Sequence, residues 1–167
     1  QLVALWGFHR DTFEPVTPDP AALQQLLQAR PSMADLQIGK DSVSSRNKAV
    51  SLDLGGFAKG WALDRVAAML RARGIHNALI NIGGNVMALG SKDGEAWKVG
   101  LQHPRKPAAM ATIALQDGEA IGTSGDYQRF FEKDGKRYAH LIDPRSGQPA
   151  EVLQAATVIA PPGEHAG

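Results

Sequence analysis

Apolar residues recur at helical spacing in one long segment of the chain. The segment begins near Phe57 and ends at Gly74, a residue that favours the left-handed end of a helix. Its apolar stripe consists of Leu63, Val66, Ala67 and Leu70. A shorter helix is predicted over residues 21–29, with Asp19 as its N-cap and Pro20 as its first residue.

The other apolar segments are short and alternate with turn residues, which is typical of β-strands. The predicted strands span residues 49–54, 78–82, 86–89, 97–102, 111–115, 119–123 and 155–160. Residues 127–132 and 137–142 are expected to pair as a hairpin, because Asp134-Gly135 between them suits the positive φ angles of a tight turn. A second turn is predicted at residues 39–41. This pattern predicts an α+β fold, in which a mostly antiparallel sheet packs with one long helix and short helices. We expect residues 1–167 to form a single domain.

Composition narrows the function classes. The 167 residues are 43% hydrophobic and carry a net charge of +1, so the chain is of the globular class and has no basic stripe for nucleic acid. It contains no cysteine, which excludes disulfides, thiolate nucleophiles and Cys-ligated metals within these residues. No apolar run approaches the roughly 20 residues that cross a bilayer.

The first motif with chemical content runs from Asp53 to Asp64 as DLGGFAKGWALD. A predicted strand delivers a carboxylate, Gly55-Gly56 allows close backbone approach, and Lys59 falls in the first turn of the long helix. Backbone N–H groups at a helix start favour phosphate, and Lys59 adds a mobile positive charge. The alternative is a tight strand-to-helix turn with a solvated lysine. The motif is not a Walker A loop, since Gly-Lys-Ser/Thr is absent.

Two further motifs follow. Asn81-Ile82-Gly83-Gly84-Asn85 indicates a sharp turn between short strands, and by itself favours a structural interpretation. The third combines Thr123-Ser124-Gly125-Asp126-Tyr127 with residues 138–149, in which His140 and Asp143 flank an apolar pair. Thr123 or Ser124 with His140 and Asp143 is conceivable as a hydrolase triad, but the nucleophile elbow Gly-x-Ser-x-Gly is missing.

In this order and spacing the three motifs resemble those of the ApbE-like FAD:protein FMN transferase family. Leu5-Trp6-Gly7-Phe8 is similar to the segment that precedes the first motif there, so the resemblance covers essentially the whole chain. It implies a magnesium-dependent enzyme that cleaves the FAD pyrophosphate, attaches FMN to a Ser or Thr of a target flavoprotein and releases AMP. Alternatives within the resemblance are an FAD pyrophosphatase and a non-catalytic relative that binds flavin or a partner protein.

The resemblance also implies roles for individual residues. The positions that match FAD contacts are Asp53, Lys59 and Ile142. Gly56 matches a position whose backbone carbonyl is a ligand of Mg²⁺. Thr123, Ser124 and His140 lie in family motifs and are interpreted as residues that line the catalytic site.

The family pattern is wider than these residues. In the family, a helix with an Asp and a Thr follows the strand at residues 157–161 and completes the metal site, and an upstream segment supplies other FAD contacts. We therefore expect residues 1–167 to be a core fragment that lacks both, and that binds Mg²⁺ and FAD poorly by itself. Family resemblance also favours a periplasmic or cell-envelope location, a subunit of a redox complex as target, and membrane anchoring through a preceding segment.

Overall fold

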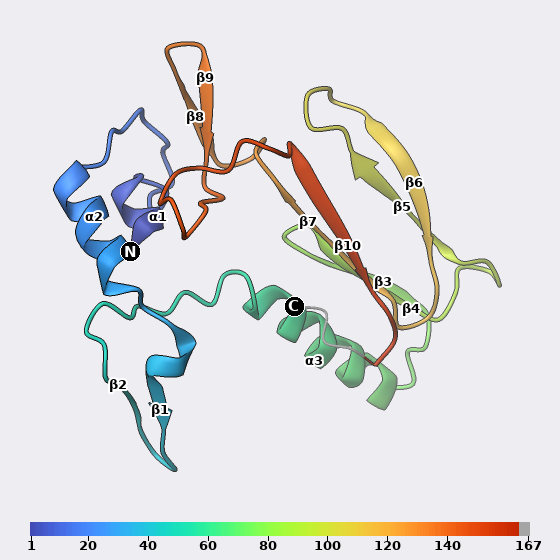
Figure 1. The fold of residues 1–167 in the computed structure, drawn as a ribbon. Coiled ribbons are helices and arrows are strands. Elements are labelled where there is room, and N and C mark those ends of the chain that lie inside the picture. Colours follow the sequence, from blue (N-terminus) through green and yellow to red (C-terminus); the bar gives the residue numbers. More distant parts are fainter. Residues whose placement is uncertain (164–167) are drawn as a thin grey trace. The chain divides into compact units, whose positions relative to one another are not determined.

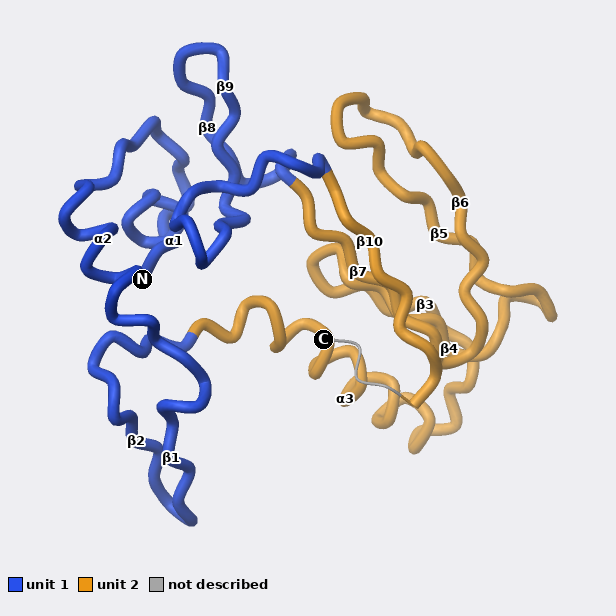
Figure 2. Tube along the Cα trace, viewed as in Figure 1, with its two compact units in different colours: residues 1–52, 126–154 blue, residues 53–125, 155–167 orange. Residues whose placement is uncertain are grey.

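The computed structural model describes residues 1–163, and the chain divides into two compact units (Figure 2). Unit 1 contains Gln1–Leu52 and Asp126–Gln154, whereas unit 2 contains Asp53–Gly125 and the residues from Ala155 on. Helices and antiparallel strands occur together within the chain, which confirms the predicted α+β class.

Unit 2 is built on a four-stranded antiparallel sheet of order β10-β7-β4-β3 (Figure 1). Its strands are β3 (Ala78–Ile82), β4 (Asn85–Leu89), β7 (Ala120–Gly125) and β10 (Ala155–Ala160). The four lie within two residues of the predicted strands. Hydrogen bonding between β7 and β10 places Thr123 opposite Thr157.

The two faces of this sheet bury different apolar sets. Helix α3 (Ala58–Ala72) covers one face, where a cluster consists of Leu63, Ala67, Met87, Leu89 and Ala120. The hairpin of β5 (Trp97–Gln102) and β6 (Ala109–Leu115) packs on the residues of the other face, Val86, Ala88 and Ile121. The predicted helix stop is confirmed, since Gly74 has φ +76° and its N–H bonds the carbonyl of Arg71 at 3.0 Å.

Unit 1 combines short helices with two hairpins. Its elements are α1 (Leu2–Leu5), α2 (Pro20–Ala29), the 3₁₀ turn η1 (Met33–Asp35), β1 (Leu36–Ile38), β2 (Val43–Ser45), β8 (Phe130–Lys133) and β9 (Lys136–Ala139). The predicted cap of α2 is confirmed, because the Asp19 carboxylate accepts hydrogen bonds from the N–H groups of Ala21 and Ala22. Both predicted hairpin turns form, and Asp134 and Gly135 have φ of +52° and +73°.

An aromatic cluster forms the core of unit 1. Trp6, Phe8 and Phe131 are buried, and Tyr138 packs against them. The rings of Phe131 and Tyr138 stack with centroids 5.1 Å apart, and the ring of Trp6 lies 5.7 Å from that of Tyr138. Residues from the start of the chain and from its last third therefore share one core.

The predicted strand at residues 49–54 is wrong. This segment is irregular: the N–H groups of Ala49 and Val50 donate locally, to the side chain and the carbonyl of Asn47, and the Ala49 carbonyl accepts from the side chain of Gln1, not from a strand. A strand needs a paired neighbour, and alternation alone does not provide one. Among the described residues, no helix is long and apolar enough to cross a membrane.

Candidate functional site

The junction before α3 is a turn held by the Asp53 carboxylate and by the Leu54 carbonyl. The carboxylate of Asp53 accepts a hydrogen bond from the Gly55 N–H at 2.7 Å, and the Leu54 carbonyl accepts from the N–H groups of Phe57 and Ala58. No side chain caps the helix at Phe57, so the positive end of the α3 dipole is open to an anion. A Cβ at Gly56 would meet no atom within 4 Å, so this position is also open.

Lys59 joins this junction to the second motif. Its Nζ donates a hydrogen bond to the Gly83 carbonyl at 3.2 Å. Gly83 and Gly84 have φ of +55° and +91°, and the side-chain oxygen of Asn81 accepts from the Gly84 N–H at 3.0 Å. Glycine is needed here because side chains rarely adopt such angles. The fold thus brings an ammonium, a glycine turn and a helix start together in unit 2.

Thr123 and Ser124 of the third motif lie on opposite faces of the sheet. Successive residues of a strand point to opposite faces. Ser124 therefore shares the face of Ala120, which α3 covers, and β7 carries it past the Asn85 end of β4. Thr123 lies on the opposite face, where its hydroxyl is 2.9 Å from that of Thr157. Both residues lie beyond the Asn85 end of β4, and of the two only Ser124 lies on the face that α3 covers.

His140 and Ile142 belong to unit 1, so the structure groups them apart from the residues above. The backbone N–H of His140 donates to the Arg129 carbonyl at 3.1 Å, and its Nδ1 lies 3.2 Å from the same oxygen. In the neutral ring, a proton on Nδ1 that faces a carbonyl leaves the lone pair on Nε2. Ile142 packs against the aromatic cluster of unit 1.

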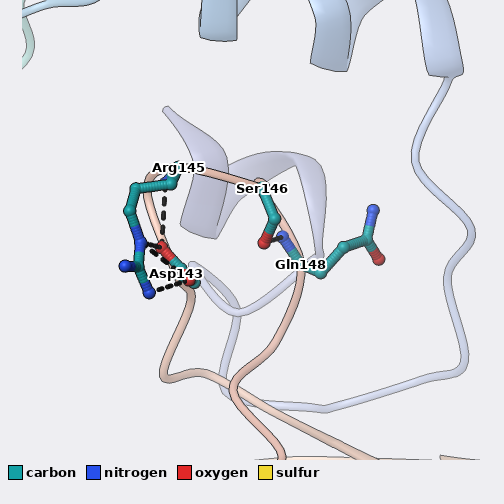
Figure 3. Close-up of polar contacts among 4 residues, drawn as sticks. All are labelled: Asp143, Arg145, Ser146 and Gln148. Atoms are coloured by element: carbon teal, nitrogen blue, oxygen red, sulfur yellow. Dashed lines mark hydrogen bonds and ion pairs between the residues drawn. The ribbon is translucent and has the colours of Figure 1, made fainter.

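Asp143 organises the turn that follows (Figure 3). Its carboxylate accepts from the backbone N–H of Arg145 at 2.9 Å and from the Arg145 guanidinium, with Nη2 at 2.7 Å. The hydrogen bonds from the Arg145 side chain and then its backbone N–H lower the pKa of Asp143 to about 2. This carboxylate is thus engaged by Arg145, while the His140 Nδ1 faces a carbonyl, which disfavours the hydrolase triad.

Sequence reasoning missed three contributors. The carbonyl of Gly83 accepts a hydrogen bond from Lys59, and the side chain of Asn81 accepts one from the Gly84 N–H within the turn. Trp6 donates a buried hydrogen bond to the carbonyl of Gly147 at 2.8 Å. Asn81 carries a local signal, since Asn readily bonds backbone N–H groups within a turn. Carbonyl acceptors carry no sequence signal, because every residue has one.

Unit 2 of this α+β protein thus places an α3 start without a side-chain cap, a glycine turn and a lysine together, an arrangement that can bind a phosphate-bearing ligand. The chain belongs to the ApbE family, whose family model matches residues 1–167. It is 40% identical over 162 residues to a FAD:protein FMN transferase of Rhodobacter capsulatus, covering 97% of this chain and 31% of that protein. It is 41% identical over 164 residues to one of Klebsiella pneumoniae, covering 95% of this chain and 49% of that protein.

The fold agrees with this assignment. The ApbE protein crystal structure from Thermotoga maritima matches with a TM-score of 0.84 at 33% identity, over 95% of this chain and 52% of that one. The chain therefore spans about a third to a half of the length of these relatives.

Proposed function

We propose that the protein is an FAD:protein FMN transferase. The observation that carries this proposal is the contact between Lys59 and Gly83, which gathers an ammonium, two glycines and an uncapped helix start in one place. Such a place can hold a pyrophosphate through charge and backbone N–H groups. The family membership and the names of the relatives support FAD as the proposed substrate.

The proposed reaction is a substitution at phosphorus. The hydroxyl oxygen of a Ser or Thr in the target protein forms a bond to the phosphorus of the FMN half of FAD. The bond from that phosphorus to the bridging oxygen breaks, and AMP leaves with the electron pair. The hydroxyl proton passes to a base or to water, and little covalent chemistry is required of the enzyme beyond positioning and charge.

The proposed role of each site residue follows from its position. Lys59 would stabilise negative charge on the pyrophosphate, and it is already exposed at the start of α3. Asp53 holds the turn through the Gly55 N–H and is proposed to contact FAD beside it. In unit 1, Ile142 is proposed as an apolar FAD contact and His140 as a residue that accepts or orients a proton through Nε2. Ser124 and Thr123 are proposed to line the site, Ser124 on the α3 face.

Magnesium dependence is part of the proposal, but the described residues do not complete a site for the ion. Mg²⁺ prefers oxygen ligands that include carboxylates. Within residues 1–163, no three His, Asp or Glu side chains are grouped so that they could hold a metal. The Gly56 carbonyl alone does not suffice to hold Mg²⁺ against water.

The remaining proposals rest on family resemblance. They are a flavoprotein subunit of a redox complex as target, a periplasmic or envelope location, and anchoring through a membrane segment. The alternative activity is hydrolysis of FAD to FMN and AMP, with water in place of the target hydroxyl.

The experiment is a transfer assay on the full-length protein with FAD, Mg²⁺ and a candidate flavoprotein subunit. Mass spectrometry should find the target heavier by one FMN, with AMP released in equal amount. FMN and AMP free in solution, with an unmodified target, would establish the hydrolase instead. Neither product at any metal concentration would refute both activities and leave a binding protein.

A further inference from the structure

A buried hydrogen bond joins two distant parts of unit 1. The Trp6 indole is 4% exposed, and its Nε1–H donates to the carbonyl of Gly147 at 2.8 Å. The rings of Phe131 and Tyr138 stack beside the indole. The donor is therefore fixed by packing, and Gly147 has a defined position relative to the aromatic cluster.

Gly147 closes the turn that follows the third motif. Its N–H donates to the carbonyl of Asp143 at 2.7 Å, while the Asp143 N–H donates to the carbonyl of Gln148 at 2.9 Å. Ile142 pairs with Pro149 as an isolated β-bridge, and the Ala150 N–H bonds the Leu141 carbonyl at 2.7 Å. The two limbs of the turn are thus cross-linked, and a fixed Gly147 also fixes Ile142.

The same N-terminal segment reaches His140. Phe8, two residues after Trp6, presents its ring to the imidazole edge-on with centroids 6.4 Å apart. Trp6 and Phe8 therefore contact the segment at residues 140–149 at two places: Trp6 at Gly147 and Phe8 at His140. Other parts of unit 1 touch the turn by packing, as Leu23 does against Gly147.

We propose that Trp6 is a positioning residue for FMN transfer. Through the Gly147 carbonyl it holds the 140–149 segment so that His140 and Ile142 meet the substrate in one geometry. This role rests on the proposed function, in which those two residues contact FAD and the reacting groups. Losing the N–H would leave a buried carbonyl without its donor and let the segment shift.

The test compares two tryptophans of the full-length protein. Trp97 also donates its Nε1–H to a backbone carbonyl, that of Leu89 at 3.0 Å, but in unit 2. Trp6→Phe and Trp97→Phe each remove one such bond, and both should lower the unfolding temperature. Only Trp6→Phe should also lower kcat for FMN transfer, by roughly tenfold. Combined with His140→Ala, Trp6→Phe should lower kcat by less than it does alone, because His140 is one of the two residues that Trp6 positions.

If Trp6→Phe does not fold, benzothienylalanine at position 6 keeps the ring shape and replaces only the N–H, with the same loss of kcat expected. Equal kcat in Trp6→Phe, Trp97→Phe and the wild type would overturn the positioning role and leave the proposed function standing. Fully additive losses with His140→Ala would show that Trp6 does not act through His140. A wild-type protein that transfers no FMN would overturn the proposed function, and this role with it.

Discussion

The ammonium of Lys59 lies 3.2 Å from the carbonyl oxygen of Gly83, so residues 24 positions apart in the sequence form one polar site. A carbonyl is a weak partner for an ammonium compared with a phosphate. The contact therefore holds Lys59 beside the glycine turn while leaving it able to move to a charged ligand.

Replacing Lys59 should weaken FAD binding without unfolding the protein. Lys59→Ala removes a charge-assisted contact worth about 1.5–3 kcal/mol, so the Kd for FAD should rise by roughly tenfold to a hundredfold. Titration of flavin fluorescence measures it. Lys98→Ala is the matched control, because Lys98 is an exposed lysine of unit 2 that pairs with Glu95. Equal affinity in both variants would remove Lys59 from the site.

Gly56 allows a test of a role carried by the backbone. It is not among the glycines with positive φ, and a Cβ there meets no atom within 4 Å. Gly56→Ala should therefore keep both the fold and the magnesium-dependent activity. Gly56→Val should lower that activity by disturbing the turn, because β-branching restricts the backbone. Wild-type magnesium dependence in Gly56→Val would contradict a metal-binding carbonyl at this position.

The Asp143–Arg145 pair should appear in the pH dependence of stability. The pKa of Asp143 is lowered from 3.8 to about 2, so its contribution is complete above about pH 4 and disappears as the pH falls towards 2. Arg145→Gln should raise this pKa back towards 3.8, although the backbone N–H of residue 145 keeps part of the shift. Carboxyl ¹³C NMR titration of both proteins measures the change. An unaltered midpoint would show that the guanidinium has no effect in solution.

Two glycines with similar angles separate backbone strain from crowding. Gly147 and Gly135 have φ of +71° and +73°, but an added Cβ would lie 2.6 Å from Leu23 Cδ1 only at Gly147. Gly135→Ala should cost about 1–2 kcal/mol of unfolding free energy from the left-handed backbone alone. Gly147→Ala should cost about 1–3 kcal/mol more from overpacking. Urea unfolding measures both, and equal costs would mean that Leu23 moves aside freely.

Residues 1–167 produced by themselves should bind neither Mg²⁺ nor FAD well. The described residues offer no convergent carboxylates, and a neutral carbonyl cannot compete with water for Mg²⁺. Calorimetry of FAD with and without Mg²⁺ measures this. Metal-dependent binding in the micromolar range, about −8 kcal/mol, would show that the whole site lies within these residues and would refute the expectation.

The elements that sequence reasoning predicted well have local causes. The Asp19 cap, the Asp134-Gly135 turn and the Gly74 helix stop each depend on neighbouring residues, and each forms as predicted. The segment at residues 49–54 failed because a strand depends on a partner that lies elsewhere in the chain.

For the site, the motifs indicated which polar residues belong to it, but not which groups these residues contact. The partnership of Lys59 with Gly83 and that of Trp6 with Gly147 each use a backbone carbonyl. Neither could be predicted, since side-chain patterns do not report on acceptors that all residues share. The opposite orientation of Thr123 and Ser124 could be predicted from the sequence, because successive side chains of a strand point to opposite faces.

The order in which the chain is made bears on how the sheet of unit 2 is completed. Strand β10 bonds along all of β7, yet residues 126–154, which belong to unit 1, are synthesised between them. Until β10 has emerged from the ribosome, the edge of β7 that β10 later pairs presents unpaired N–H and carbonyl groups to other strands. The exposed side of β7 is thus open to wrong pairing until β10 appears, and a delay in translation over residues 126–154 would lengthen that interval.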